Sequence, residues 1–304
     1  MTSRPEVVCR DPRFAEGPVW CPASEHRAAS LVCTSVSDGA LFRVDVDAGT
    51  STRLADTGGG ANGAAPCADG GFLVTQNGGI DLAAVGMFED PPPFSPAQPG
   101  LQRVAPDAGV EYLTPDVLQA PNDLVVGEDG TVYFTDPPSW PLPEDARGRV
   151  WAYGRHGDLS LIADGLFYPN GIGIEADGTL VIVENGLMGR PHFGLVRLGV
   201  SGEHDRFAAQ TGDGFCLDVD GRFYVAGGIH GVTVLDSDGT VAEILEIPAP
   251  PTGGPGVTTN CCFGGHDLRT LFATEAVPGG VVAWEGMPAP GARVASWPGP
   301  TSAP

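Results

Sequence analysis

Hydrophobic residues along this chain gather in short runs in which apolar and polar positions often alternate, and Gly-rich turns separate the runs. Such runs, rich in β-branched and aromatic residues and joined by Asp-Gly turns, predict β-strands paired as antiparallel hairpins. One region predicts strands over 124–126, 131–135, 149–153 and 159–162. No long run has the period and caps of a helix. The pattern therefore predicts an all-β protein built from four-stranded antiparallel units.

The four-stranded unit repeats along the chain. In each copy a polar residue is followed seven positions later by an Asp, and then by a strand-like run. Repeats at intervals of roughly 40–60 residues are typical of solenoids and propellers, and four-stranded units arranged in a ring form a β-propeller. We therefore expect a single six-bladed propeller domain over 1–304. The copies begin at Asn62, Asn122, Asn170, Asp213 and Asn260, and Glu16 begins a looser sixth copy.

The two ends of the chain are expected to close the ring. The last copy runs out of strands near 281–284, and the apolar run at 6–9 can supply the missing strand. The Pro/Gly-rich segment 286–304 is expected to be a tail or a partial cover.

The residues that begin the copies predict a cation site, because equivalent positions of a ring converge on its axis. Glu16, Asn122, Asn170 and Asp213 would contribute two carboxylates and two amide carbonyls. Such an all-oxygen set suits Ca²⁺, Mg²⁺ or Mn²⁺. The absence of Cys and His from the set argues against a structural zinc site, although a catalytic Zn²⁺ stays open. For a single Asn the alternative is a turn made by its side chain; four equivalent positions favour a shared site.

The loops that follow the second strand of each copy should return to the face on which the polar residues lie. These loops are long in the second and third copies and moderate in the fourth, and long loops on a rigid scaffold often carry binding residues, with a tolerated surface insertion as the alternative. Trp140 and His192 lie on them and are candidate substrate contacts. Glu184, at the end of a strand, is a further candidate, with a position on the solvated rim as the alternative. Asn62 is another candidate, with a purely structural role as the alternative.

Composition limits the classes of partner. The net charge is −22 and all 16 basic residues are Arg, so nucleic-acid binding is not expected, because phosphate attraction needs a basic face. The lack of Lys excludes Schiff-base chemistry and a Walker lysine. No apolar run approaches the roughly 20 residues that span a bilayer. Seven Cys without a CxxC pair, and an N-terminus without a basic-then-apolar leader, predict a cytoplasmic protein. The sequence does not determine the oligomeric state.

Several motifs together resemble the SMP-30/gluconolactonase/luciferin-regenerating enzyme family. The resemblance spans about 6–284 and implies a six-bladed propeller with a divalent cation at its axis, Ca²⁺ first among the candidates. It also implies that Glu16, Asn170 and Asp213 are protein ligands, and that Asn122 is a fourth ligand or contacts both metal and substrate. The motifs are 14–20 (FAEGPVW), 121–123 (PND), 133–136 (YFTD), 169–171 (PNG), 212–214 (GDG), 262–265 (CFGG) and 271–274 (LFAT).

Many members of that family hydrolyse lactones, so the resemblance implies a metal-dependent hydrolase that opens a small lactone or similar ester. Asp213 is the expected general base, with a role as ligand alone as the alternative. Ala120 stands where sugar-lactone hydrolases of the family often carry an Arg, which makes a polyol substrate doubtful. Organophosphate hydrolysis, a non-hydrolytic reaction at the same site, and a metal-stabilised propeller that binds without turnover stay open as alternatives.

Overall fold

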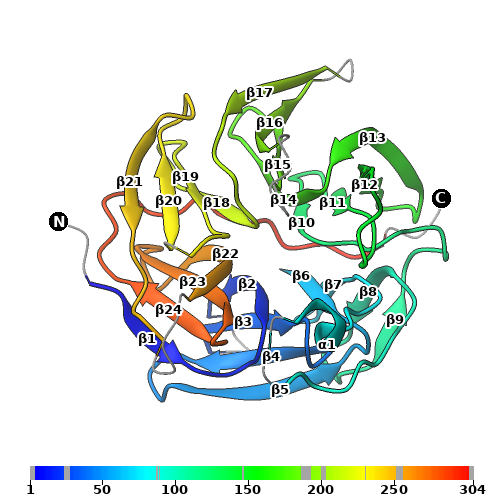
Figure 1. Ribbon diagram of the computed structural model, residues 1–304, viewed down its shortest axis with the longest axis horizontal. Coiled ribbons are helices and arrows are strands. Elements are labelled where there is room, and N and C mark those ends of the chain that lie inside the picture. The colour runs from blue at the N-terminus through cyan, green and yellow to red at the C-terminus, as the bar shows by residue number, and fades with distance from the viewer. Residues whose placement is uncertain are drawn as a thin grey trace.

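The computed structural model is a ring of six antiparallel sheets with four strands each, so the all-β six-bladed propeller predicted from the sequence is confirmed (Figure 1). Within the described part of the chain the only helix is α1 (Leu82–Val85), and no helix is long and apolar enough to cross a membrane. The structure describes residues 4–23, 28–86, 88, 90–145, 147–185, 193–199, 203–229, 231–250 and 256–300.

Five blades follow the chain in simple order, each running from an inner strand near the axis to an outer strand at the rim. The first is β2 (Ala15–Cys21), β3 (Ser30–Ser35), β4 (Ala40–Asp45) and β5 (Thr50–Asp56); the second is β6 (Ala61–Pro66), β7 (Phe72–Gln76), β8 (Gly100–Val104) and β9 (Val110–Tyr112); the third is β10 (Leu124–Val126), β11 (Val132–Asp136), β12 (Arg147–Tyr153) and β13 (Leu159–Phe167). The fourth is β14 (Pro169–Ile174), β15 (Leu180–Glu184), β16 (Gly194–Leu198) and β17 (His204–Ala208); the fifth is β18 (Phe215–Leu217), β19 (Phe223–Val225), β20 (Val232–Leu235) and β21 (Val241–Leu245).

The sixth blade closes the ring by joining the two ends of the chain. It combines β22 (Val257–Gly264), β23 (Thr270–Val277) and β24 (Val281–Trp284) with β1 (Glu6–Cys9), which pairs antiparallel with β24. The predicted closure by the strand at 6–9 is therefore confirmed. Some predicted strand ends are wrong by a few residues: the strand expected over 159–162 continues as β13 to Phe167, because bulges in its pairing with β12 keep the two strands together.

Apolar side chains packed between neighbouring blades form the core. All five residues of β7 are buried, whereas most of β13 at the rim is partly or fully exposed. Between the fifth and sixth blades, the rings of Tyr224 and Phe263 meet edge to face with centroids 4.9 Å apart. Burial of each such side chain contributes about 1.5–3 kcal/mol. Six similar interfaces make the ring a rigid support for residues near the axis.

Hydrogen bonds between blades fix the backbone near the axis. The hydroxyls of Thr34 and Thr75, on the second strands of the first two blades, donate to the carbonyl oxygens of Asn62 and Asn122 in the next blade. The hydroxyl of Thr135 in the third blade likewise donates to the Asn170 carbonyl at 2.6 Å. In each case the Thr hydroxyl binds the backbone carbonyl of the Asn, and the side-chain amide of the Asn takes no part in this bond between blades.

The segment 286–300, which we call the strap, crosses the face of the ring on which the Asp-Gly turns lie. Trp297 is only 1% exposed and packs among apolar side chains of the second and third blades. Its backbone N–H donates to the carbonyl oxygen of Pro66, and its carbonyl accepts from the N–H of Ala68, both at 2.8 Å. Residues 286–300 therefore cover part of this face, with Trp297 as a buried anchor.

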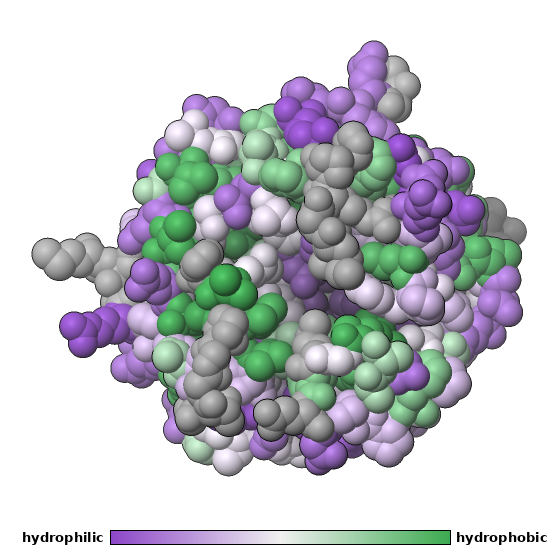
Figure 2. Space-filling view, in the orientation of Figure 1, coloured by the Kyte–Doolittle hydropathy of each residue, from purple (hydrophilic) through white to green (hydrophobic). Residues whose placement is uncertain are grey.

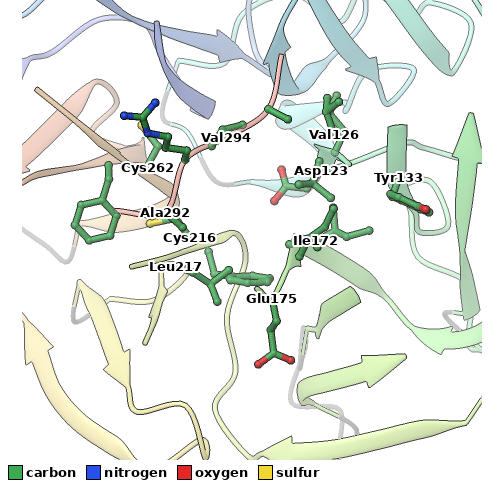
Figure 3. Close-up of a pocket in the computed structure, with 18 of the residues that line it drawn as sticks. Asp123, Val126, Tyr133, Ile172, Glu175, Cys216, Leu217, Cys262, Ala292 and Val294 are labelled. Carbon is green, nitrogen blue, oxygen red and sulfur yellow. The ribbon is translucent and has the colours of Figure 1, made fainter. Parts of the chain in front are cut away.

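A cavity of about 970 Å³ lies between the strap and the blades on this face. Figure 3 shows Ala292 and Val294 of the strap at its edge, and the carboxylate of Asp123 facing its open middle. Among the residues expected to form the functional site, none lines this larger cavity. The candidate chemistry lies on the opposite face of the ring.

Candidate metal and substrate site

A smaller cavity of about 120 Å³ opens on the face opposite the strap and brings the predicted residues together. Figure 2 views this face and shows a hollow near its middle, with hydrophilic atoms inside and hydrophobic atoms on parts of its rim. Each polar residue lies at or just before the start of an inner strand, as the repeat predicted. The residues that we call the axial residues are Glu16, Asn62, Asn122, Asn170 and Asp213, and all five line the cavity.

Three amide oxygens of the axial residues are buried without a hydrogen-bond partner. They are the Oδ1 atoms of Asn62, Asn122 and Asn170, while the backbone carbonyls of the same residues accept the threonine bonds described above. A buried polar atom without a partner costs about 1–3 kcal/mol, so such atoms in a native fold need an explanation. Three of them lining one cavity fit a hard cation that takes oxygen ligands.

The two axial carboxylates are strongly perturbed. Burial raises the pKa of Glu16 well above its usual range, and the nearby charges of Asp213 and Asp123 raise it further. Burial also raises the pKa of Asp213, helped by the charge of Asp123 and opposed by a hydrogen bond from Asn170. Like charges held together in a dry site favour a bound cation over two free carboxylates. In the described residues no three His, Cys, Asp or Glu side chains form a ligand cluster, so the amide oxygens would complete any set.

Asn260 begins the sixth copy but does not line the cavity; its side chain lies next to Glu16 and Asp123. Its Nδ2 donates to both carboxylate oxygens of Asp123, at 2.8 and 2.9 Å, and its Oδ1 accepts from the N–H of Cys261 at 2.8 Å. Burial raises the pKa of Asp123 to about 7, and the Asn260 bonds oppose this shift. Asp123 thus places a third acidic group next to the axial carboxylates, on the strap side.

A second layer of buried polar residues fixes the backbone that leads into the site. Oδ1 of Asp136 accepts from the N–H groups of Gln119 and Ala120, at 2.8 and 2.9 Å. Oε1 of Glu184 accepts from the N–H of Phe167 at 2.7 Å, and its Oε2 pairs with Arg206. Glu184, a candidate substrate contact, is 3% exposed and is absent from the described lining of the cavity.

The remaining sequence candidates fall into two groups. Trp140 lines the cavity as expected, and its Nε1 donates to the hydroxyl of Tyr168 at 3.2 Å. Asn62 lines it as well. His192 lies outside the described residues.

Residues two positions before three of the axial residues also line the cavity, and the sequence did not predict Phe14 and Tyr168 among them. Phe14, Ala120 and Tyr168, which we call the collar, stand two positions before Glu16, Asn122 and Asn170, and all three line the cavity. Phe14 and Tyr168 have positive φ angles of 40° and 44°. This backbone conformation costs a side-chain-bearing residue roughly 1–2 kcal/mol and is common at functional sites. The shared spacing of two positions before an axial residue could have predicted that these three residues line the cavity.

Comparison with known proteins identifies the family. The SMP-30/Gluconolactonase/LRE-like family model matches residues 14–277. The chain belongs to this family. Its relatives include a gluconolactonase from Zymomonas mobilis, 26% identical over 298 residues, which cover 89% of this chain and 78% of the relative. A pentonolactonase from Haloferax volcanii is 24% identical, with 89% of this chain and 84% of the relative covered.

Solved structures of the family share the fold. Regucalcin from Agrobacterium tumefaciens, described as a calcium-binding protein, superposes with a TM-score of 0.75 at 18% identity, over 97% of both chains. At this identity the similarity concerns the propeller alone. The resemblance to the family found in the sequence motifs is therefore confirmed, and so is the fold that it implied.

Proposed function

We propose that this protein is a divalent-cation-dependent hydrolase that opens a small lactone. The observation that carries the proposal is the set of three unpartnered amide oxygens and two perturbed carboxylates around one cavity. The names of two sequence relatives, a gluconolactonase and a pentonolactonase, support the same class of reaction.

Glu16, Asn122, Asn170 and Asp213 would hold the cation, with Asn62 next to them. The donor set consists of oxygen atoms and carries two carboxylates, which suits Ca²⁺ first and Mg²⁺ or Mn²⁺ as alternatives, and it does not exclude a catalytic Zn²⁺. When bound, such an ion polarises a carbonyl and stabilises the negative charge that develops on its oxygen.

In this proposal Asp213 is the general base. Burial raises the pKa of Asp213 to about 8 in the metal-free protein, and a bound cation would lower it, so that the carboxylate is available as a proton acceptor at neutral pH. Asp213 takes a proton from a water molecule while the water oxygen attacks the lactone carbonyl carbon. The ring C–O bond then breaks, the leaving alkoxide takes up the proton held by Asp213, which restores the carboxylate, and the product is a hydroxy acid.

The amide of Asn170, which donates to Asp213, orients its carboxylate, and Asn122 is placed to contact both the cation and the substrate. Trp140 and Asn62 are the proposed substrate contacts among the described lining residues. The buried Glu184 is assigned a positioning role through its bond to the N–H of Phe167, next to Tyr168.

The test is the variant Asp213→Asn, which keeps an oxygen ligand and removes the base. Chelator-treated protein is titrated with Ca²⁺ or Mn²⁺ by calorimetry, and acid release from γ- and δ-lactones is followed in a pH-stat. We expect turnover to fall about 10²–10⁴-fold, as for loss of a general base. Cation affinity is expected to fall much less, by about 10–100-fold.

Asp129→Asn, in an exposed turn on the other face, serves as the matched control and should change neither quantity. Wild-type turnover that persists in excess chelator would refute the metal dependence. Tight cation binding without turnover on lactones or phosphotriesters would identify a binding protein instead of an enzyme.

A further inference from the structure

The wall of the cavity above the axial residues is strongly apolar. The methyl group of Ala120 and the ring of Phe14 belong to the collar, and the side chains of Val36 and Trp140 complete the side of the cavity. No Arg, His, Ser, Thr or Gln side chain lines it within the described part of the chain. The two carboxylates and the three unpartnered amide oxygens are therefore concentrated at the axial end, where the reaction is proposed.

A loop of the second blade adds a further apolar surface. The loop between β7 and β8 contains α1, and Ile80, Leu82 and Val85 of this loop line the cavity. Figure 1 shows α1 next to the second blade on the viewed face, which is the face of the cavity. Leu82 is only 3% exposed, so it is part of a packed surface.

The loop is tied to the collar, which argues that its position is built into the fold. The ring of Phe88 packs against the ring of Phe14 with centroids 6.0 Å apart. The guanidinium of Arg13 lies over Phe88 and donates to the carbonyl oxygen of Asp90. At the base of the loop, Oδ1 of Asn77 accepts from the N–H of Gly79 at 2.9 Å.

Three polar side chains also line the wall, those of Asn77, Tyr168 and Asn185, and bonds occupy part of the hydrogen-bonding capacity of the first two. Oδ1 of Asn77 is engaged by Gly79, and the hydroxyl oxygen of Tyr168 accepts from Trp140. A polyhydroxylated lactone would place several hydroxyls against methyl, aliphatic and aromatic groups. Each buried hydroxyl without a partner is penalised, whereas an alkyl group in the same place is favoured.

We infer that the substrate is a small lactone whose ring carries an apolar substituent, in contrast to the sugar-type lactones named for the sequence relatives. The inference rests on the proposed hydrolysis of lactones. The axial residues take the ester group, and the collar with Ile80, Leu82 and Val85 takes the substituent. The cavity of about 120 Å³ keeps the substrate small, because sites for drug-sized ligands occupy roughly 300–1,000 Å³.

The experiment compares kcat/KM for γ-butyrolactone, γ-hexanolactone and xylono-1,4-lactone, using the full chain with added Ca²⁺ or Mn²⁺. We expect kcat/KM for γ-hexanolactone to exceed kcat/KM for γ-butyrolactone by about 10- to 200-fold, the range per methylene in an apolar pocket. We also expect kcat/KM for γ-hexanolactone to exceed kcat/KM for xylono-1,4-lactone by at least that factor. A higher kcat/KM for the hydroxylated lactone would overturn the inference and leave the hydrolase proposal intact.

Val85→Asn tests the wall itself, with Ala84→Asn on the exposed side of the same short helix as the matched control. Val85→Asn should lower the ratio of kcat/KM for γ-hexanolactone to kcat/KM for γ-butyrolactone about tenfold, and Ala84→Asn should leave this ratio unchanged. An unchanged ratio in Val85→Asn would count against the inference.

Calorimetry with an alkyl γ-lactam and a hydroxylated γ-lactam, which resist hydrolysis, gives a second measurement that is independent of turnover. Preferred binding of the alkyl lactam without hydrolysis of any lactone would overturn the proposed reaction and support the apolar site. Preferred binding of the hydroxylated lactam would overturn the apolar site.

Discussion

The side-chain amide of Asn260 donates to both carboxylate oxygens of Asp123, which belongs to the blade on the opposite side of the ring. The bond joins residues 137 positions apart. We expect Asn260→Ala to lower the free energy of unfolding by about 1.5–3 kcal/mol, the range for a hydrogen bond to a charged group. Urea unfolding at pH 8, above the pKa of Asp123 of about 7, measures it with the carboxylate ionised.

The double-mutant cycle with Asp123→Asn provides the control. In the Asp123→Asn background the charge is gone, so Asn260→Ala should cost clearly less than in the wild type. An equal loss of unfolding free energy in both backgrounds would show that the bond between Asn260 and Asp123 does not stabilise the ring.

The threonine bonds between blades give a second prediction. Thr135→Val removes the hydroxyl that donates to the Asn170 carbonyl at 2.6 Å and accepts from the N–H of Asp123 at 3.1 Å. The free energy of unfolding should fall by about 1–3 kcal/mol because two buried groups lose a partner. Cation affinity, measured by calorimetry, should fall about 10–100-fold, since Asn170 is no longer held. Thr52→Val on an exposed rim strand is the control, and equal behaviour of the two variants would contradict the prediction.

Loss of Trp297 tests the strap. Trp297→Ala empties a site that is 1% exposed between the second and third blades, so the free energy of unfolding should fall by about 3–5 kcal/mol. Val294→Ala, in the same segment but 56% exposed, should change it by no more than about 0.5 kcal/mol. Chemical unfolding of both variants measures the difference. A small effect of Trp297→Ala would mean that the strap does not stabilise the ring.

The effect of pH on stability should reverse when a cation is present. Glu16 and Asp213 bind protons more tightly in the folded, metal-free protein than in the unfolded chain. Their contribution is therefore fully present below the unfolded pKa values near 4, and it is lost as pH rises towards the raised folded values. Ca²⁺ needs the deprotonated carboxylates, so its stabilisation should grow over the same range, to about 2.7 kcal/mol at a hundredfold excess over Kd.

Thermal unfolding at pH 5 and pH 8, with chelator and with Ca²⁺, measures this effect. The double variant Glu16→Gln/Asp213→Asn should respond little to the ion and should change less with pH than the wild type, the remaining change coming from Asp123, whose pKa burial raises to about 7. A Ca²⁺-induced shift in Tm that is as large at pH 5 as at pH 8 would contradict the assignment of these carboxylates to the cation.

The spacing of seven residues in five copies, with the looser copy at Glu16, was sufficient to predict the number of blades because the marker is local. The closure of the ring followed from the apolar run at 6–9 and the missing strand of the last copy. It also predicted that Glu16, Asn122, Asn170 and Asp213 line one cavity. The side-chain direction of Asn260 could not be predicted in this way, because its partner lies across the ring. For the same reason the burial of Trp297 under distant blades was missed.

The second layer of buried polar residues around the site could have been predicted from a repeated pattern in the sequence. On the second strands, Thr34, Thr75, Thr135 and Thr274 are each followed by a buried polar residue. The hydroxyls of Thr34, Thr75 and Thr135 each donate to a carbonyl in the next blade, and the following residue binds the backbone before an axial position. The role of Glu184 follows from this pattern, although a Val precedes it.

The pairing of β1 with β24 has a consequence for biosynthesis. The strand β1 has no partner until residues 281–284 have also emerged from the ribosome, so the sixth sheet can be completed only after the five other blades have been synthesised. Until then β24 has an open edge, and open sheet edges invite pairing with other chains. The cation would reach its full set of ligands only after this last strand has docked, so loading is expected to follow synthesis.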